Sequence, residues 1–235
     1  MNTTAAPISP IVIVALDVPS LADAQAMVTR IGPHAEFFKV GLQLFTAEGP
    51  RVVEWLHAQG KRVFLDLKLY DIPNTVRQAA ESARRMNVEL LTVHGLGGAA
   101  MVRAAVDGAG DATGVLVVTV LTSMDSTEYG IATGRAQVTV ETEVLRLSAV
   151  AAEAGAHGVV TSGAEVAAVR RTFGDRLRPL VPGIRMTGDA ANDQLRIVTP
   201  AMAAANGAAY IIVGRAVTAA LDPAVALQKV LTELA

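Results

Sequence analysis

Eight short apolar runs, separated by Ala-rich stretches with helical spacing, constrain the fold of this chain most strongly. The runs are almost continuously apolar, which is typical of parallel strands buried on both faces. They lie at residues 11–17, 35–41, 62–68, 89–95, 114–121, 157–162, 178–184 and 210–216. The stretches between them, for example 20–31 and 141–154, have the apolar spacing of amphipathic helices. This repeated strand–helix unit predicts an α/β chain folded as a closed TIM (β/α)8 barrel.

Helix-end signals agree with this division. Ser20 is a plausible N-terminal cap, and glycines follow several helical stretches, at positions 32, 60, 155 and 207. A doubly wound open sheet is the alternative. However, no G-x-G-x-x-G follows the first run, and the weak match at 93–98 follows the fourth.

Length and composition limit the domain count and the kind of partner. The chain has 235 residues, of which 51% are hydrophobic, so we expect a lead at 1–10 without signal-peptide character and one barrel domain at 11–235. Twenty Lys and Arg against 22 Asp and Glu offer no basic surface for nucleic acid or acidic membranes. The absence of cysteine excludes disulfides and cysteine-ligated metals and is compatible with the cytoplasmic location that we expect. A small molecule is the expected partner.

The third run carries charges that a buried strand would normally avoid. In the sequence FLDLKLYDIPNTV, at 64–76, Asp66 and Lys68 share one strand face because successive side chains alternate. Asp71 follows in the loop beyond the strand, and Asn74 is expected to cap a helix that starts at Thr75. The strand therefore aims a carboxylate and an ammonium at one place.

Other predicted strands also end in polar residues, where barrel enzymes carry their chemistry. Asp17 ends the first run, Lys39 ends the second, and Thr122 and Ser123 follow the fifth. A purely structural salt-bridge lattice is the alternative, but buried ion pairs are poor devices for stability alone. His94, beside glycines, is interpreted as a hydrogen-bonded structural residue. The charged strand ends thus favour a functional array.

Two arginines indicate an anion site. Arg185 follows the seventh run after Gly183, and Arg215 follows the eighth after Gly214. The loops after strands seven and eight commonly bind phosphate in this fold. A phosphorylated ligand is therefore the working hypothesis.

The connection after the fifth run, residues 122–140, is long and polar. Its part at 123–138 could be a lid or a simple surface loop, and the sequence leaves both interpretations open.

The chain resembles the orotidine 5'-monophosphate decarboxylase family over nearly its whole length. The resemblance rests, in order, on ALD, FKVG, FLDLKLYDIPNTV, LTSM, VPGIR, NDQ and VGRAV. It implies conversion of OMP to UMP by a homodimeric barrel that needs neither metal nor organic cofactor, with active sites at the subunit interface.

The resemblance also implies residue roles. Lys68 would be the proton donor, flanked by Asp66 and by Asp71 of the partner subunit, while Lys39 and Asp17 would complete the charged network and hold the ribose. The remaining substrate contacts would be Thr75 from across the interface to the ribose, Thr122 and Ser123 to the pyrimidine, and Arg185, Gln194, Gly214 and Arg215 to the phosphate.

Two other functions remain open. A Mg2+-dependent 3-keto-gulonate 6-phosphate decarboxylase-like barrel also carries Asp-x-Lys-x-x-Asp, although DIPNTV and NDQ favour the orotidylate enzyme. A non-catalytic nucleotide-binding barrel is the third interpretation, and the intact Asp66, Lys68 and Asp71 argue against it.

Overall fold

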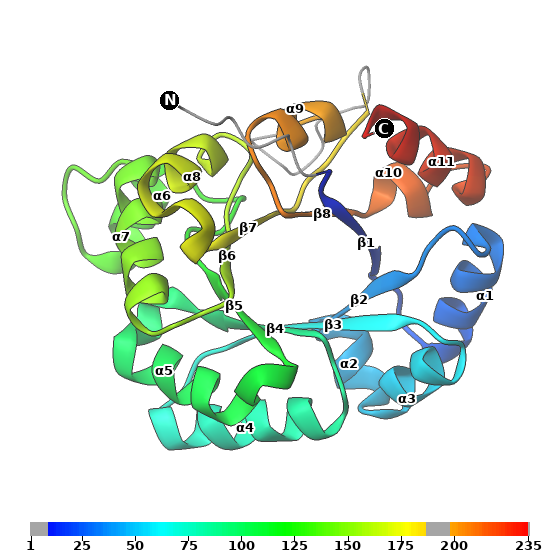
Figure 1. Ribbon diagram of the computed structural model, residues 1–235, viewed down its shortest axis with the longest axis horizontal. Coiled ribbons are helices and arrows are strands. Elements are labelled where there is room, and N and C mark those ends of the chain that lie inside the picture. Colours follow the sequence, from blue (N-terminus) through cyan, green and yellow to red (C-terminus); the bar gives the residue numbers. More distant parts are fainter. Residues whose placement is uncertain (1–8, 187–197, 235) are drawn as a thin grey trace.

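The computed structural model of the protein describes residues 9–186 and 198–234. Eight parallel strands form a closed barrel in sequential order, so the predicted TIM barrel is confirmed and the open sheet is wrong. Looking down the barrel, Figure 1 shows the ring of strands enclosed by helices. The strands are β1 (Ile11–Leu16), β2 (Phe37–Gly41), β3 (Arg62–Leu69), β4 (Leu90–His94), β5 (Gly114–Val118), β6 (Gly158–Val160), β7 (Arg178–Val181) and β8 (Tyr210–Val213).

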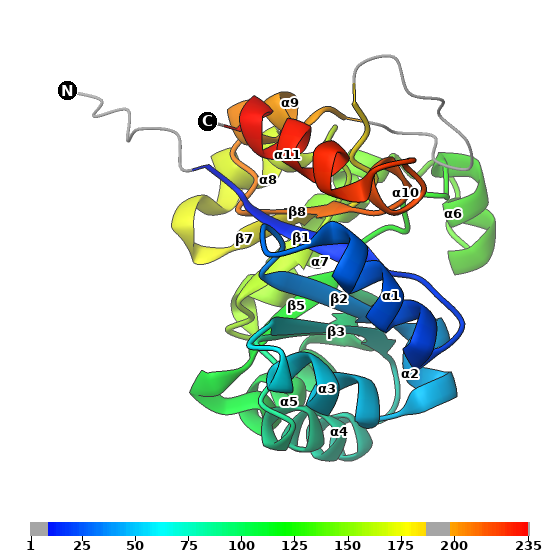
Figure 2. The ribbon, with the colours of Figure 1, turned by 90° about the vertical axis from the view of Figure 1, so that its right-hand side faces the viewer.

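The helices follow the strands around the outside of the barrel (Figures 1 and 2). They are α1 (Leu21–Ile31), α2 (Leu42–Glu48), α3 (Arg51–Ala58), α4 (Pro73–Arg85), α5 (Gly98–Ala109), α6 (Ser126–Thr133), α7 (Val140–Glu153), α8 (Val166–Phe173), α9 (Pro200–Ala205), α10 (Arg215–Thr218) and α11 (Pro223–Glu233). Short 3-10 turns lie at Gly95–Gly97, Gly110–Ala112 and Gly174–Arg176. Among the described residues, the helices all lack the length and apolar character that crossing a membrane would require.

The predicted helix boundaries are mostly correct. The Ser20 hydroxyl accepts a hydrogen bond from the Asp23 backbone N–H and caps α1, and Gly32 is the C-terminal cap with a φ of 77°. The prediction that Asn74 caps a helix from Thr75 is wrong. Helix α4 begins at Pro73 with Ile72 as its cap, because proline has the backbone angle required for the first helical turn and needs no hydrogen-bond acceptor there.

Two apolar layers hold the barrel together. Inside it, side chains such as Ile13, Phe37 and Phe64 pack against one another, whereas the alternate strand residues pack outward against the helices. On β3, Phe64 thus belongs to the interior and Leu65 to the outer layer. Polar residues that continue the inward alternation beyond this interior layer must face the carboxyl-end mouth of the barrel.

Candidate active site

A chain of four charged side chains crosses the mouth of the barrel at the ends of β1, β2 and β3. Lys39 Nζ lies 2.7 Å from Asp17 Oδ1 and 3.7 Å from Asp66 Oδ2. Lys68 Nζ lies 2.9 Å from Asp66 Oδ1. The structure therefore brings Asp17, Lys39, Asp66 and Lys68 together with alternating sign, as expected from the strand ends.

In this row of ion pairs the two middle side chains are buried, and the two side chains at its ends are more exposed to solvent. The Lys39 and Asp66 side chains are 9% and 12% exposed, whereas the Lys68 side chain is 33% exposed. Burial makes each ion costly unless it is paired, so the inner Lys39–Asp66 pair is held by opposite charges on both sides. The arrangement presents one ammonium, that of Lys68, where a ligand can reach it.

A small cavity of about 160 Å³ adjoins Lys68 at the mouth of the barrel. Its apolar floor includes Phe64, Leu180 and Ile212, and its polar groups include Asp66, Lys68 and Thr122. Of the two residues expected after the fifth strand, Thr122 lines the cavity, whereas Ser123 is exposed beside it in sequence. The cavity therefore combines apolar lining residues with the Asp66–Lys68 ion pair.

Strand β3 leaves regular pairing where it carries the charges. Leu65 pairs with Leu91 and Leu69 with Val93, so four steps along β3 match two steps along β4. The two extra residues preserve the parity of the strand, which is why Asp66 and Lys68 still point inward as predicted. Opposite this bulge lies Thr92, a fully buried residue that donates a hydrogen bond from Oγ1 to Asp66 Oδ1 at 2.9 Å.

Thr92 was missed in the sequence analysis. In the sequence it is visible only as a single hydroxyl residue within the apolar run at 89–95, on the same strand face as His94. His94 itself accepts a hydrogen bond at Nδ1 from the Leu96 backbone N–H, which fits the structural interpretation. Burial, and then the charge of Lys68, lowers the pKa of His94.

The expected phosphate residues occupy the loops after β7 and β8. Arg185 is buried, and its Nη1 donates to the Ile184 carbonyl at 2.9 Å. Gly214 precedes α10 as its cap, and Arg215 is the exposed first residue of that helix. Gln194 lies outside the described residues. Both described arginines are therefore on the carboxyl-end side of their strands.

Asp71 and Thr75 lie beyond the end of β3 and are exposed. Asp71 Oδ1 accepts a hydrogen bond from the Ile72 backbone N–H at 2.6 Å. Within the described part of this single chain, the Asp71 carboxylate lies outside the chain of ion pairs that joins Asp17 to Lys68.

The segment expected as a lid or surface loop contains helix α6. Asp125 caps it and forms a reciprocal capping box with Glu128, and Gly134 ends it in a left-handed conformation. Figure 2 shows α6 on the side of the barrel where β1 ends. Residues 126–133 of this segment are therefore helical, and a lid function of 123–138 stays a prediction.

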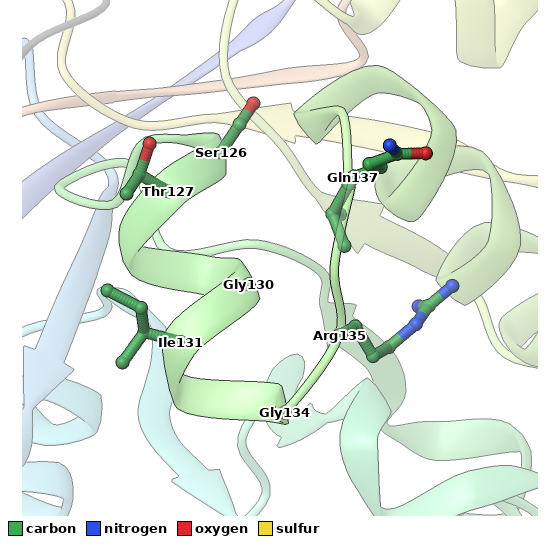
Figure 3. A pocket seen from close by; sticks show the side chains of 8 residues that line it. Ser126, Thr127, Gly130, Ile131, Gly134, Arg135 and Gln137 are labelled. Atoms are coloured by element: carbon green, nitrogen blue, oxygen red, sulfur yellow. The ribbon is translucent and has the colours of Figure 1, made fainter.

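An open hollow of about 380 Å³ lies between α6 and the residues that follow it (Figure 3). In Figure 3 the Arg135 side chain extends away from α6, and it pairs with buried Glu143 of α7. Glu143 also accepts hydrogen bonds from Tyr129 and Arg146. Helix α6 is thus fastened to α7 by a buried carboxylate.

Comparison with known proteins gives a consistent family assignment. Residues 10–230 match the family described as Orotidine 5'-phosphate decarboxylase / HUMPS. The chain is 50% identical over 216 residues to orotidine 5'-phosphate decarboxylase of Anaeromyxobacter dehalogenans, covering 92% of this chain and 94% of that one. It is 42% identical over 231 residues to the protein of the same name from Moorella thermoacetica, covering 95% and 91%. The crystal structure of orotidine 5'-phosphate decarboxylase from Lactobacillus acidophilus superposes with a TM-score of 0.84 at 34% identity, covering 97% and 99%.

Proposed function

The chain belongs to the orotidine 5'-phosphate decarboxylase / HUMPS family, and from this premise we propose that it converts OMP into UMP and CO2 in pyrimidine biosynthesis (EC 4.1.1.23). The observation that carries the proposal is the Asp17–Lys39–Asp66–Lys68 chain beside a cavity with an apolar floor. It supplies a cation at the one place where the reaction develops negative charge.

The chemistry requires such a cation. When the bond between C6 and the carboxylate breaks, CO2 leaves and the electron pair stays on C6, which has no ready electron sink. Lys68 stabilises this carbanion electrostatically and then transfers a proton from Nζ to C6. The neutral amine regains a proton from solvent before the next cycle.

Asp66 and Lys39 serve Lys68 in this scheme. Asp66 holds Nζ of Lys68 at 2.9 Å, while Lys39 balances the charge of Asp66 from the other side. Asp17, at the exposed end of the row of ion pairs, and the buried Lys39 beside it hold the ribose. Preorganised charges of this kind need little rearrangement when the carbanion forms.

The remaining contacts bind the substrate. Thr122, which lines the cavity, and Ser123 contact the pyrimidine. Arg185, Gln194, Gly214 and Arg215 hold the phosphate, whose binding energy is remote from the reacting bond and can position the ring against Lys68.

The working enzyme is a homodimer in this proposal. Tyr70 and Ile72, which flank Asp71, are 63% and 67% exposed, and large apolar side chains at such exposure favour coverage by a second copy of the chain. Asp71 and Thr75 then enter the partner's site, completing the pair of acids around Lys68 and adding a contact to the ribose. The expected cytoplasmic location stays a prediction.

One assay tests the reaction and its alternatives. Purified protein is mixed with OMP in EDTA, and the loss of absorbance is followed as UMP forms. Turnover supports the proposal. Turnover that requires added Mg2+ favours the 3-keto-gulonate 6-phosphate decarboxylase-like chemistry, and binding without turnover favours a non-catalytic nucleotide-binding barrel.

A further inference from the structure

The bulge in β3 creates a hydrogen-bonding problem at Lys68. Between the pairs Leu65–Leu91 and Leu69–Val93, the register between β3 and β4 is shifted. A backbone N–H in such a bulge loses its ladder carbonyl and, when part-buried, needs another acceptor. The Lys68 backbone N–H donates instead to Thr92 Oγ1, at 2.9 Å.

Lys68 also has an unusual backbone conformation. Its φ is 50°, in the left-handed region that residues other than glycine rarely adopt. Such conformations persist when the surroundings hold them, and they gather at functional sites. The hydrogen bond from the Lys68 N–H to Thr92 Oγ1 ties this backbone to β4 within the bulge.

The same hydroxyl orients the carboxylate that pairs with Lys68. Thr92 Oγ1 donates its proton to Asp66 Oδ1 at 2.9 Å, the oxygen that Lys68 Nζ also approaches at 2.9 Å. Because a hydroxyl has one proton, the geometry assigns Thr92 as donor to Asp66 and acceptor from Lys68 N–H. Asp66 Oδ2 is left to face Lys39 at 3.7 Å.

We propose that Thr92 is a positioning residue for the decarboxylation: its buried hydroxyl fixes both the backbone of Lys68 and the rotamer of Asp66, and so sets the place of the Lys68 ammonium. The inference rests on the proposed function. A placement error of about 1 Å at a reacting group can cost on the order of 100-fold in rate, so the hydroxyl matters beyond its effect on folding.

The test removes the hydroxyl without changing the shape of the side chain. Thr92→Val should lower kcat about 10- to 100-fold and change KM for OMP much less, because Lys68 acts mainly in the transition state. Thr113→Val is the matched control. Thr113 is buried at the opposite end of the barrel and donates to the Val88 carbonyl at 2.8 Å, so its variant should keep wild-type kcat when folded.

A second pair of variants keeps the test valid if Thr92→Val does not fold. Thr92→Ser and Thr92→Ala lack the same methyl group and differ by one hydroxyl. Serine should restore kcat to within about threefold of wild type and alanine should not. Equal kcat values for these two folded variants would overturn the proposal.

Ligand binding separates positioning from general damage. Thr92→Val should weaken binding of 6-hydroxy-UMP, whose C6 oxyanion meets Lys68, at least tenfold more than binding of UMP. Equal weakening of both ligands, or a folded Thr92→Val with wild-type kcat, would overturn the role of Thr92. Absence of turnover by the wild-type protein would instead overturn the proposed function, and the Asp66–Lys68 separation in a crystal structure of Thr92→Val would still test the positioning.

Discussion

At the scale of single residues, the position of Lys68 explains why a strand inside an apolar barrel carries charge. Its ammonium is part-exposed at the cavity, while the Asp66 and Lys39 side chains behind it are buried. Deleting the ammonium therefore removes the proposed proton donor without emptying the core.

The first prediction concerns this ammonium. Lys68→Ala should remain folded but lose about 10⁴-fold or more in kcat, because a general acid and a preorganised cation disappear together. Steady-state turnover of OMP and circular dichroism measure the two effects. Lys229→Ala, at an exposed position of α11, is the control and should keep full activity. A folded Lys68→Ala with near-normal turnover would refute the mechanism.

Gly41 gives a second residue-scale prediction. A Cβ at this position would lie 2.8 Å from Lys39 Nζ and 3.2 Å from Asp17 Oδ1, so a side chain there must displace the Lys39–Asp17 pair. Because a flexible lysine can move cheaply, Gly41→Ala should leave the melting temperature nearly unchanged and lower kcat/KM about tenfold or more. Thermal melts and turnover assays distinguish this result from a folding defect. Unchanged kcat/KM would show that the Lys39–Asp17 geometry does not matter.

Arg215 gives a third residue-scale prediction. If its guanidinium holds the phosphate, Arg215→Ala should lose about 100-fold or more in kcat/KM for OMP, since charge-assisted bonds to phosphate are among the stronger polar contacts. Added guanidinium should restore part of the activity. A variant that keeps wild-type kcat/KM would place the phosphate elsewhere.

The same scale shows what the sequence could and could not predict. Alternation along β3 correctly predicted that Asp66 and Lys68 share a face, and a bulge of two residues leaves that parity intact. For this reason the alternation of side chains along β3 does not reveal the bulge. The hydroxyl of Thr92 was visible as one polar residue in an apolar run, but its two hydrogen bonds depend on the bulge and could not be inferred without it.

At the scale of elements, the eight strands were predictable because parallel strands buried on both faces are continuously apolar. Helix α6 was harder, since its exposed sequence has little apolar periodicity. The spacing of Asp125 and Glu128, with Gly134 after them, was a readable start and stop signal that the sequence analysis did not use. The link from α6 to α7 depends on a tertiary contact, the one that Arg135 makes with Glu143.

That link leads to a prediction about stability. Burial by itself would raise the pKa of Glu143, but hydrogen bonds and charge interactions with Arg146 and Arg135 outweigh it, so the pKa lies below its ordinary value of 4.5. Glu143→Gln should therefore lower the free energy of unfolding at pH 7 by about 1.5–3 kcal/mol.

The pH dependence of this loss has a defined sign. A carboxylate with a depressed folded pKa contributes stability above its unfolded pKa and loses it as pH falls through the folded pKa. Denaturant titrations should thus show the whole difference in the free energy of unfolding between wild type and Glu143→Gln at pH 7. This difference should become smaller below about pH 4.5. Glu81→Gln, which breaks the exposed Glu81–Arg77 pair, should cost less than about 0.5 kcal/mol. A Glu143 effect that is constant with pH would contradict the assigned charge.

At the scale of the whole molecule, Asp71 of a single barrel lies away from the charged site of the same barrel, although it is expected to act in an active site. Asp66 and Lys68 point into the mouth, whereas Asp71 lies past the strand end, between the exposed side chains of Tyr70 and Ile72. A two-fold dimer would cover these side chains and carry each Asp71 toward the other subunit's Lys68. Such an interface is isologous, so both active sites become composite in the same way.

Composite sites make a quantitative prediction for mixed dimers. Lys68→Ala and Asp71→Ala should each be nearly inactive alone, but a heterodimer contains one site with both lesions and one site with neither. Equal mixing with random subunit exchange should therefore restore about a quarter of the wild-type sites, by counting subunit combinations. Turnover is measured after mass spectrometry has shown that heterodimers have formed. If heterodimers form and the mixture stays inactive, Asp71 does not act across the interface, whereas recovery near one quarter requires that it does, because neither variant can supply both groups within one chain.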